Sequence, residues 1–75
     1  MARQPKLPLQ SRFGLRIRRL RESHGWSFTY LAVHSGIAKS TLLEIEKGRA
    51  DVRLSTVAAL AGSFGKTVSE LLRGI

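Results

Sequence analysis

The sequence of 75 residues contains no cysteine and no asparagine, only two prolines and only five acidic residues. The missing cysteines exclude disulfides, cysteine-ligated zinc and thiol catalysis, and the missing asparagines exclude N-linked glycosylation. No hydrophobic run approaches the roughly 18 residues that span a membrane, and the N-terminus lacks the hydrophobic stretch of a secretory signal. These absences predict a small cytoplasmic protein with a single hydrophobic core and no membrane partner.

The scarcity of acidic residues leaves a strong positive charge. Thirteen Lys and Arg residues outnumber five Asp and Glu residues, which gives a formal net charge of +8. Residues 1–21 hold seven of the basic residues and none of the acidic ones. Such an excess indicates the partner rather than the fold, and nucleic acid ranks ahead of an anionic membrane surface or an acidic protein. The alternative is a solvated helix face whose charge serves solubility alone.

The hydrophobic pattern predicts helices only. Residues 1–10 hold both prolines and show no periodicity, which indicates a flexible basic arm before one domain at residues 11–75. Phe13, Ile17 and Leu20 then repeat at helical spacing, and no segment alternates with the period of a strand. N-cap residues and glycine stops divide the domain into five helices, at residues 11–24, 28–34, 39–47, 54–63 and 68–72. The predicted fold class is a compact, all-α five-helix bundle.

A very short turn that contains glycine joins the second and third predicted helices, as in a helix-turn-helix. Ala32 is small enough for a close helix crossing, Gly36 tolerates a positive φ, and Ile37 can plug the turn into the core. The residues expected to build this motif are Leu31, Ala32, Gly36, Ile37, Leu42 and Ile45. The alternative is an ordinary α-hairpin of a small bundle, in which alanine and glycine also occur at this spacing.

Over about residues 13–72, the sequence resembles the lambda-repressor/Cro-type (XRE-type) helix-turn-helix DNA-binding domain family. The similarity is carried by Gly25-Trp26-Ser27, Leu31-Ala32, Ser35-Gly36-Ile37 and the Ile45-Glu46-Lys47-Gly48 that closes the third helix. The resemblance implies a bundle whose third helix enters the major groove of double-stranded DNA. It also implies a sequence-specific transcriptional regulator, a repressor or autoregulator, from a bacterium, phage or mobile element.

The resemblance also assigns individual roles. Base reading falls on the outward half of the third helix, at Lys39, Ser40, Thr41, Leu43 and Glu44. Phosphate contacts, which position a protein without reading sequence, are expected from Ser27, Lys47, Arg49, Arg53, Arg16 and Arg19. For Arg16 and Arg19 the alternative is a contribution to the positive field alone. A structural ion pair is expected between Arg21 of the first helix and Glu46 of the third.

Two positions depart from the family pattern. Phe28 stands where the family commonly has a glutamine that binds a phosphate, so that contact is in question. Ala38 replaces the usual Ser or Thr cap of the third helix, which forgoes about 1 kcal/mol of capping. The backbone N–H groups left without a cap would then need water or a DNA phosphate.

A homodimer on a two-fold symmetric operator is expected, because one recognition helix contacts too few base pairs to be specific in a genome. The predicted dimer interface consists of Val68, Leu72 and Ile75 at the C-terminal end. The alternative is a monomer in which Val68 and Leu71 belong to the core, while Leu72 and Ile75 are merely exposed. A second functional alternative is an antitoxin, which binds a toxin or similar protein partner and also represses its own operon.

No enzyme activity is expected. Gly65-Lys66-Thr67 resembles the end of a phosphate-binding loop, but Leu60 stands where that loop requires glycine, and no strand precedes it. His24 and His34 have no metal-ligating neighbour at a useful spacing. We therefore expect no catalytic residue, no cofactor and no metal, and a role beside DNA in the nucleoid.

Overall fold

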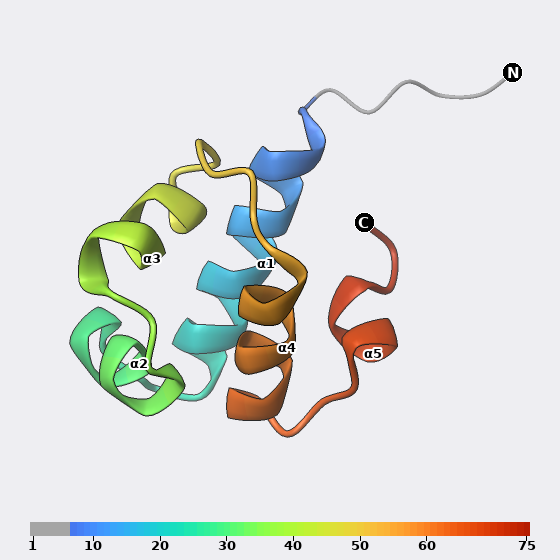
Figure 1. Cartoon of the computed structure of the whole chain (residues 1–75). Coiled ribbons are helices and arrows are strands. Elements are labelled where there is room, and N and C mark those ends of the chain that lie inside the picture. Colours follow the sequence, from blue (N-terminus) through green and yellow to red (C-terminus); the bar gives the residue numbers. More distant parts are fainter. Residues whose placement is uncertain (1–6) are drawn as a thin grey trace, which may run out of the picture.

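The computed structural model describes residues 7–75, which form five helices joined by short loops (Figure 1). The helices are α1 (Leu9–Ser23), α2 (Phe28–Ser35), α3 (Lys39–Glu46), α4 (Leu54–Ser63) and α5 (Val68–Leu72). Residues 7–75 contain no strand, so the predicted all-α class is confirmed. In the same range no helix has the length and hydrophobicity needed to cross a membrane. The predicted arm at residues 1–10 lies mostly outside the described residues.

The ends of the helices follow local capping signals. Ser27 caps α2, its Oγ accepting the backbone N–H of Tyr30 at 3.0 Å, and α2 stops at Gly36, whose φ is 76°. Thr67 and Glu70 cap α5 reciprocally: Oγ1 of Thr67 accepts the N–H of Glu70 at 3.0 Å, and Oε1 of Glu70 accepts the N–H of Thr67 at 2.8 Å. The bond from the Thr67 N–H lowers the pKa of Glu70 below its ordinary value.

The first helix begins earlier than predicted. Hydrophobic periodicity suggested a start at Ser11, whereas α1 begins at Leu9, directly after Pro8. The carbonyl of Pro8 accepts the N–H of Arg12 at 3.1 Å, which closes the first turn. Proline suits this place because the first N–H groups of a helix have no partner within it, and proline has none to leave unpaired.

All five helices contribute to one hydrophobic core. Its buried residues are Phe13, Ile17, Leu31, Ala32, Leu42, Ile45, Val57, Leu60, Ala61, Phe64 and Leu71. No polar or charged side chain is buried with them in the described part of the chain. Full burial of one such leucine or isoleucine stabilises a fold by about 1.5–3 kcal/mol, so this core replaces the disulfides that the sequence lacks.

The two helices that meet most extensively are α1 and α3. They approach backbone to backbone at Gly14, where an added Cβ would overlap the carbonyl oxygen of Ile45 and press on the backbone of Glu46. Only glycine permits so close a contact. Gly14 therefore fixes the distance between α1 and the C-terminal end of α3.

Replacing Gly14 by alanine is expected to destabilise the fold by about 1–3 kcal/mol, the usual cost of overpacking. Gly62 provides the matched control, because it also lies inside a helix but has open space at its Cβ position. Gly62→Ala should stabilise the fold by about 0.5–1 kcal/mol through helix propensity. Urea unfolding followed by circular dichroism measures both variants. Equal shifts in the same direction would contradict the close approach at Gly14.

Candidate DNA-binding surface

The residues predicted for the helix-turn-helix occupy its structural positions. Leu31 and Ala32 of α2 and Leu42 and Ile45 of α3 are buried in the core. Gly36 has the positive φ that the turn requires, and Ile37 packs partly against the core. The turn between α2 and α3 is thus held on both sides. As Figure 1 shows, α3 consequently lies at the edge of the bundle.

One side of α3 faces solvent. Because successive residues turn by 100°, burial of Leu42 and Ile45 directs Ser40, Leu43 and Lys47 away from the core. Lys39, Ser40, Thr41 and Leu43 are all exposed, and Glu44 is half-buried. The exposed face of α3 therefore centres on Ser40 and Leu43, with Lys39 and Thr41 at its opposite edges. We call this face the strip. Leu43 is notable because a hydrophobic side chain is 40% exposed there.

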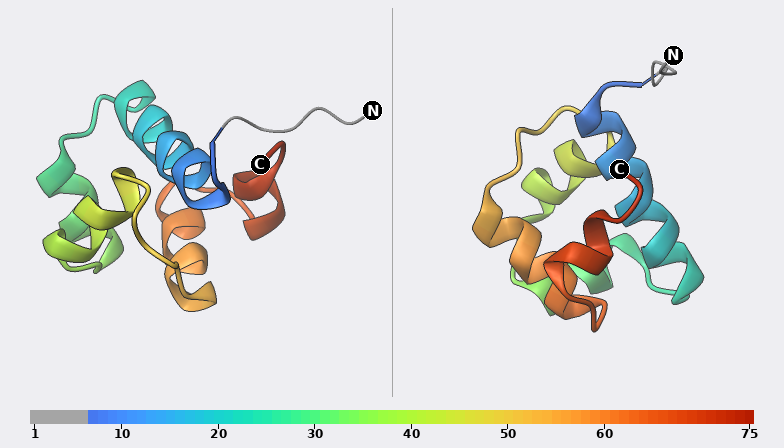
Figure 2. Two further views of the ribbon diagram at one scale, coloured as in Figure 1. Left: turned by 90° about the horizontal axis from the view of Figure 1, so that it is seen from above. Right: turned by 90° about the vertical axis from the view of Figure 1, so that its right-hand side faces the viewer.

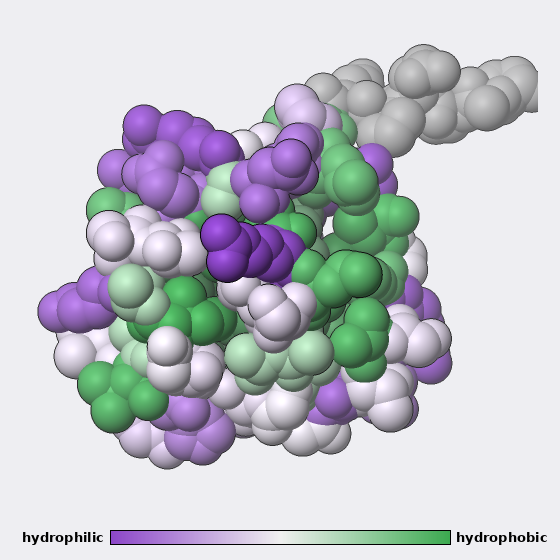
Figure 3. Space-filling view, viewed as in Figure 1, coloured by the Kyte–Doolittle hydropathy of each residue, from purple (hydrophilic) through white to green (hydrophobic). Residues whose placement is uncertain are grey.

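Basic residues surround the C-terminal end of this strip. Lys47, Arg49 and Arg53 are exposed, and Figure 3 shows hydrophilic side chains over the end of α3 and the loop that follows. Arg49 also lies beside Glu44, with 4.0 Å between Nε and Oε1. The Arg49 side chain is mostly exposed and the Glu44 side chain is about half exposed, so the pair restrains Glu44 only weakly.

A hollow of about 410 Å³ separates the first turn of α3 from the start of α4. Its lining includes Ala38, Thr41, Arg53 and Thr56. Ala38 supplies no side-chain cap to α3, as the sequence predicted. The hollow thus brings together two hydroxyls, the guanidinium of Arg53 and the carboxylate of Asp51. Thr56 had no expected role, because its position in sequence gives no sign that α4 begins beside α3.

Phe28 is not a surface residue at the start of α2. Its ring is half-buried against the core, and the guanidinium carbon of Arg21 lies 6.0 Å from the ring centroid. Phe28 therefore packs against the core beside Arg21, where the glutamine of the family pattern would make a polar contact. Ser27 remains exposed next to it, and its hydroxyl can still donate a hydrogen bond while its oxygen caps α2.

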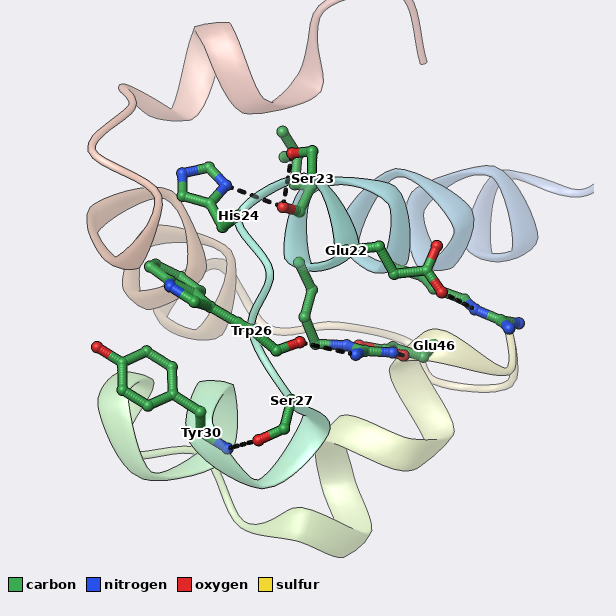
Figure 4. Close-up of polar contacts among 10 residues, drawn as sticks. Glu22, Ser23, His24, Trp26, Ser27, Tyr30 and Glu46 are labelled. Carbon is green, nitrogen blue, oxygen red and sulfur yellow. Dashed lines mark hydrogen bonds and ion pairs between the residues drawn. The ribbon is translucent and has the colours of Figure 1, made fainter.

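Arg21 and Glu46 form a two-bonded ion pair between α1 and α3 (Figure 4). Nε lies 2.8 Å from Oε2, and Nη2 lies 3.0 Å from Oε1. Nη1 of Arg21 also donates to the carbonyl of Trp26 at 3.1 Å, just before α2. Only 14% of the Arg21 side chain and 8% of the Glu46 side chain are exposed. The bonds to Glu46 raise the pKa of Arg21 above its ordinary value.

We predict that Glu46→Ala destabilises the protein in the absence of DNA. Loss of one partner leaves a buried charge unpaired, which costs about 3–5 kcal/mol at full burial and nearer 3 kcal/mol where water reaches Arg21. Glu22 is the matched control, since it pairs with Arg18 of the same helix in solvent. Glu22→Ala should cost less than about 0.5 kcal/mol. Thermal unfolding distinguishes the two variants, because about 1 kcal/mol shifts the midpoint by about 4–8 °C in a domain of this size. Similar midpoints for both variants would show that the ion pair of Arg21 is not structural.

The structure places Arg16 and Arg19, two of the predicted phosphate contacts, on a side of α1 away from α3. Nε of Arg16 donates to the carbonyl of Leu71 at 3.1 Å, and Nη2 donates to that of Glu70 at 3.2 Å. Arg16 thus holds the end of α5 against α1. Arg19 lines the same hollow as Arg16. At 100° per residue both lie on the side of α1 turned about 140–160° away from Gly14, which contacts α3, so neither borders the strip on α3.

The C-terminal residues predicted as a dimer interface are only partly available. Val68 and Leu72 are 38% and 37% exposed, whereas Ile75 is half-buried and packs against the core. The expectation that Ile75 faces outward with them is corrected. Leu54, at the start of α4, is 81% exposed. The sequence pattern did not identify it as a surface residue, because a leucine at the start of a helix is expected in the core. In Figure 3 hydrophobic side chains gather over α5 and the neighbouring end of α1.

Comparison with known proteins identifies the class. The family described as "Helix-turn-helix domain" matches residues 12–74. The chain is 35% identical over 60 residues to the HTH-type transcriptional regulator DdrOP3 of Deinococcus deserti, which covers 80% of this chain and 46% of that protein. It is 42% identical over 57 residues to the HTH-type transcriptional regulator AnsR of Bacillus subtilis, with 76% and 49% covered. The restriction-modification controller protein C.AhdI from Aeromonas hydrophila superposes with a TM-score of 0.79 at 33% identity, with 84% and 96% covered.

The chain belongs to the helix-turn-helix domain family, which confirms the resemblance noted in the sequence. Both curated relatives are named as transcriptional regulators. The chain spans about half the length of the two curated relatives.

Proposed function

We propose that this chain is a sequence-specific transcriptional regulator that inserts α3 into the major groove of double-stranded DNA. The observation that carries the proposal is the exposed strip of α3, which projects from a helix-turn-helix whose other side is buried. The major groove is about 12 Å wide, which admits one helix. The site of action is then the DNA of the cytoplasm.

The side chains of the strip suit base edges. Lys39 can donate to O6 and N7 of guanine, Glu44 can accept from N4 of cytosine, and Thr41 or Leu43 can contact the methyl group of thymine. Ser40 can donate or accept. Around the strip, the hydroxyl of Ser27 and the cations of the α3–α4 loop would hold the phosphates: Lys47, Arg49 and Arg53. These contacts position α3 in the groove but carry no sequence preference.

Substitutions at Arg53 and Lys39 should have different effects on DNA binding. Arg53→Gln should weaken binding to all duplexes alike and reduce the slope of log K against log salt by about 0.9, the value of one phosphate contact. Lys39→Gln should instead change base preference at one position, by about 1–3 kcal/mol for a lost two-bonded contact. Arg73→Gln, exposed near the C-terminus, is the charge-matched control. Fluorescence anisotropy at several salt concentrations, with duplexes selected from random DNA, measures all three.

We also propose that the chain acts as a homodimer joined through α5. Val68 and Leu72 are the exposed hydrophobic residues of this short helix, and Leu72 borders an apolar groove of about 350 Å³ that also contains Leu54 and Leu9. A symmetric pair buries the same patch on both copies. Two copies of α3 about 34–36 Å apart would then fit successive turns of a two-fold symmetric operator.

Leu72→Glu should convert a dimer into a monomer, because the symmetric interface would contain two facing carboxylates. Operator binding should fall while helicity remains unchanged. Val33→Glu serves as the control, since Val33 is a more exposed hydrophobic residue on α2, and it should leave the dimer intact. Sedimentation at tens of micromolar decides the question: a single species of 8.3 kDa, unaffected by Leu72→Glu, would contradict the dimer.

The antitoxin alternative is not favoured. Both curated relatives are named as transcriptional regulators, and DNA binding alone accounts for the strip on α3. A toxin partner would add a second interface without changing how α3 reads DNA.

A further inference from the structure

The outer side of α1 carries a second basic surface, which the proposed DNA contacts do not use. A hollow of about 550 Å³ lies between this side of α1 and the C-terminal residues. We call it the α1 groove and define it by Arg12, Arg16, Arg19, Leu15, Leu20 and Ile75. The three arginines follow one stripe of the helix, and the other three side chains form a hydrophobic floor.

No acidic side chain balances these three arginines in the described residues, and residues 1–6 contain no acid. Among the five acidic residues, Glu22, Glu44 and Glu46 pair with other arginines. Glu70 caps α5, and Asp51 lies in the α3–α4 loop. Within residues 7–75, Arg12 and Arg16 donate to backbone carbonyls alone, and Arg19 is exposed. The groove therefore keeps its positive charge in the folded protein.

The groove is separated from the DNA-reading strip by the body of α1. Gly14 faces α3, whereas the arginine stripe is turned about 140–160° from it around the helix axis. The left view of Figure 2 shows α1 at one side of the bundle, with α3 and α4 both on its inner side. A helix with its side chains is about 10–12 Å across. A duplex seated on α3 therefore leaves the α1 groove free.

We propose that the α1 groove is a docking site for an acidic, partly hydrophobic polypeptide segment of a partner protein. Carboxylates match the planar fork of arginine, and hydrophobic side chains of an amphipathic segment would cover the floor formed by Leu15, Leu20 and Ile75. A second copy of the chain fits poorly, because it would present the same three arginines, and four of its five acidic side chains are already engaged. Duplex DNA could match the charge but has no side chain to cover the floor, since its bases are stacked inside.

The probe is a synthetic 14-residue peptide of two Leu-Glu-Glu-Leu-Ala-Glu-Ala repeats, titrated into the full chain and followed by amide NMR. The expected result is a set of shifts at Leu15, Arg19, Ser23 and Gly74, with α3 unaffected, and the same shifts when α3 is already occupied by a duplex. A peptide with glutamine in place of every glutamate should bind at least about threefold more weakly, because its ion pairs with the arginines are lost; equal binding of the two peptides would overturn the proposal. Absence of binding, or shifts centred on α3, would overturn the proposal.

Two neighbouring arginines provide a matched pair of variants. Arg19→Gln should weaken peptide binding about threefold, the size of one exposed ion pair. Arg18→Gln removes the same charge one residue away but faces Glu22 rather than the groove, and it should change nothing. Arg16 is left intact because it holds α5. Equal weakening by both variants would show that the peptide responds only to the net charge of the chain. Shifts in the groove on titration with duplex DNA alone would show that the groove binds nucleic acid. Either outcome would overturn the proposal.

Discussion

The orientation of α3 depends on the guanidinium of Arg21. This group donates two bonds to Glu46 at the end of α3 and one to the carbonyl of Trp26 before α2, so it links three helices at a single point. A buried ion pair adds little net stability compared with hydrophobic packing, because desolvation offsets most of the attraction. Its two-bonded geometry nevertheless permits one register only. Together with the backbone contact at Gly14, it fixes the C-terminal end of α3, while the turn at Gly36 fixes the other end.

The arginines of α1 have different contacts because successive residues of a helix point in different directions. Arg21 points inward to α3, Arg18 pairs with Glu22 in solvent, and Arg16 reaches the carbonyls of α5. Arg12 and Arg19 remain as net charge on the outer side. The proposed phosphate contacts are consequently left to the few cations near α3. This separation means that the overall charge of the chain overstates the charge available to a duplex in contact with α3.

Local signals in the sequence predicted most of the fold. Ser27, Gly36 and the Thr67–Glu70 box act on hydrogen bonds within a few residues, so they mark helix ends whatever the tertiary structure. The first turn of α1 escaped prediction because it precedes the hydrophobic repeat. The strip on α3 followed from burial of its opposite side. The role of Arg16 could not follow from sequence, because its acceptors lie 54 and 55 residues away and nothing local distinguishes it from neighbouring arginines. The partial burial of Ile75 could not be predicted for the same reason. Whether a terminal residue packs against the domain depends on a groove that other helices build.

The shortest helix depends on its anchors. A helix of five residues such as α5 has almost no stability in isolation, so its position rests on buried Leu71, on its capping box and on Arg16. Arg16 and Arg21 both project from α1, a helix of 15 residues, and hold α5 and α3 respectively. The spacing between the proposed dimer surface and the DNA-reading strip is therefore set through one rigid element. In a two-fold assembly, any shift of α5 relative to α1 would be doubled in the distance between the two copies of α3, and operator spacing would be the property most sensitive to it.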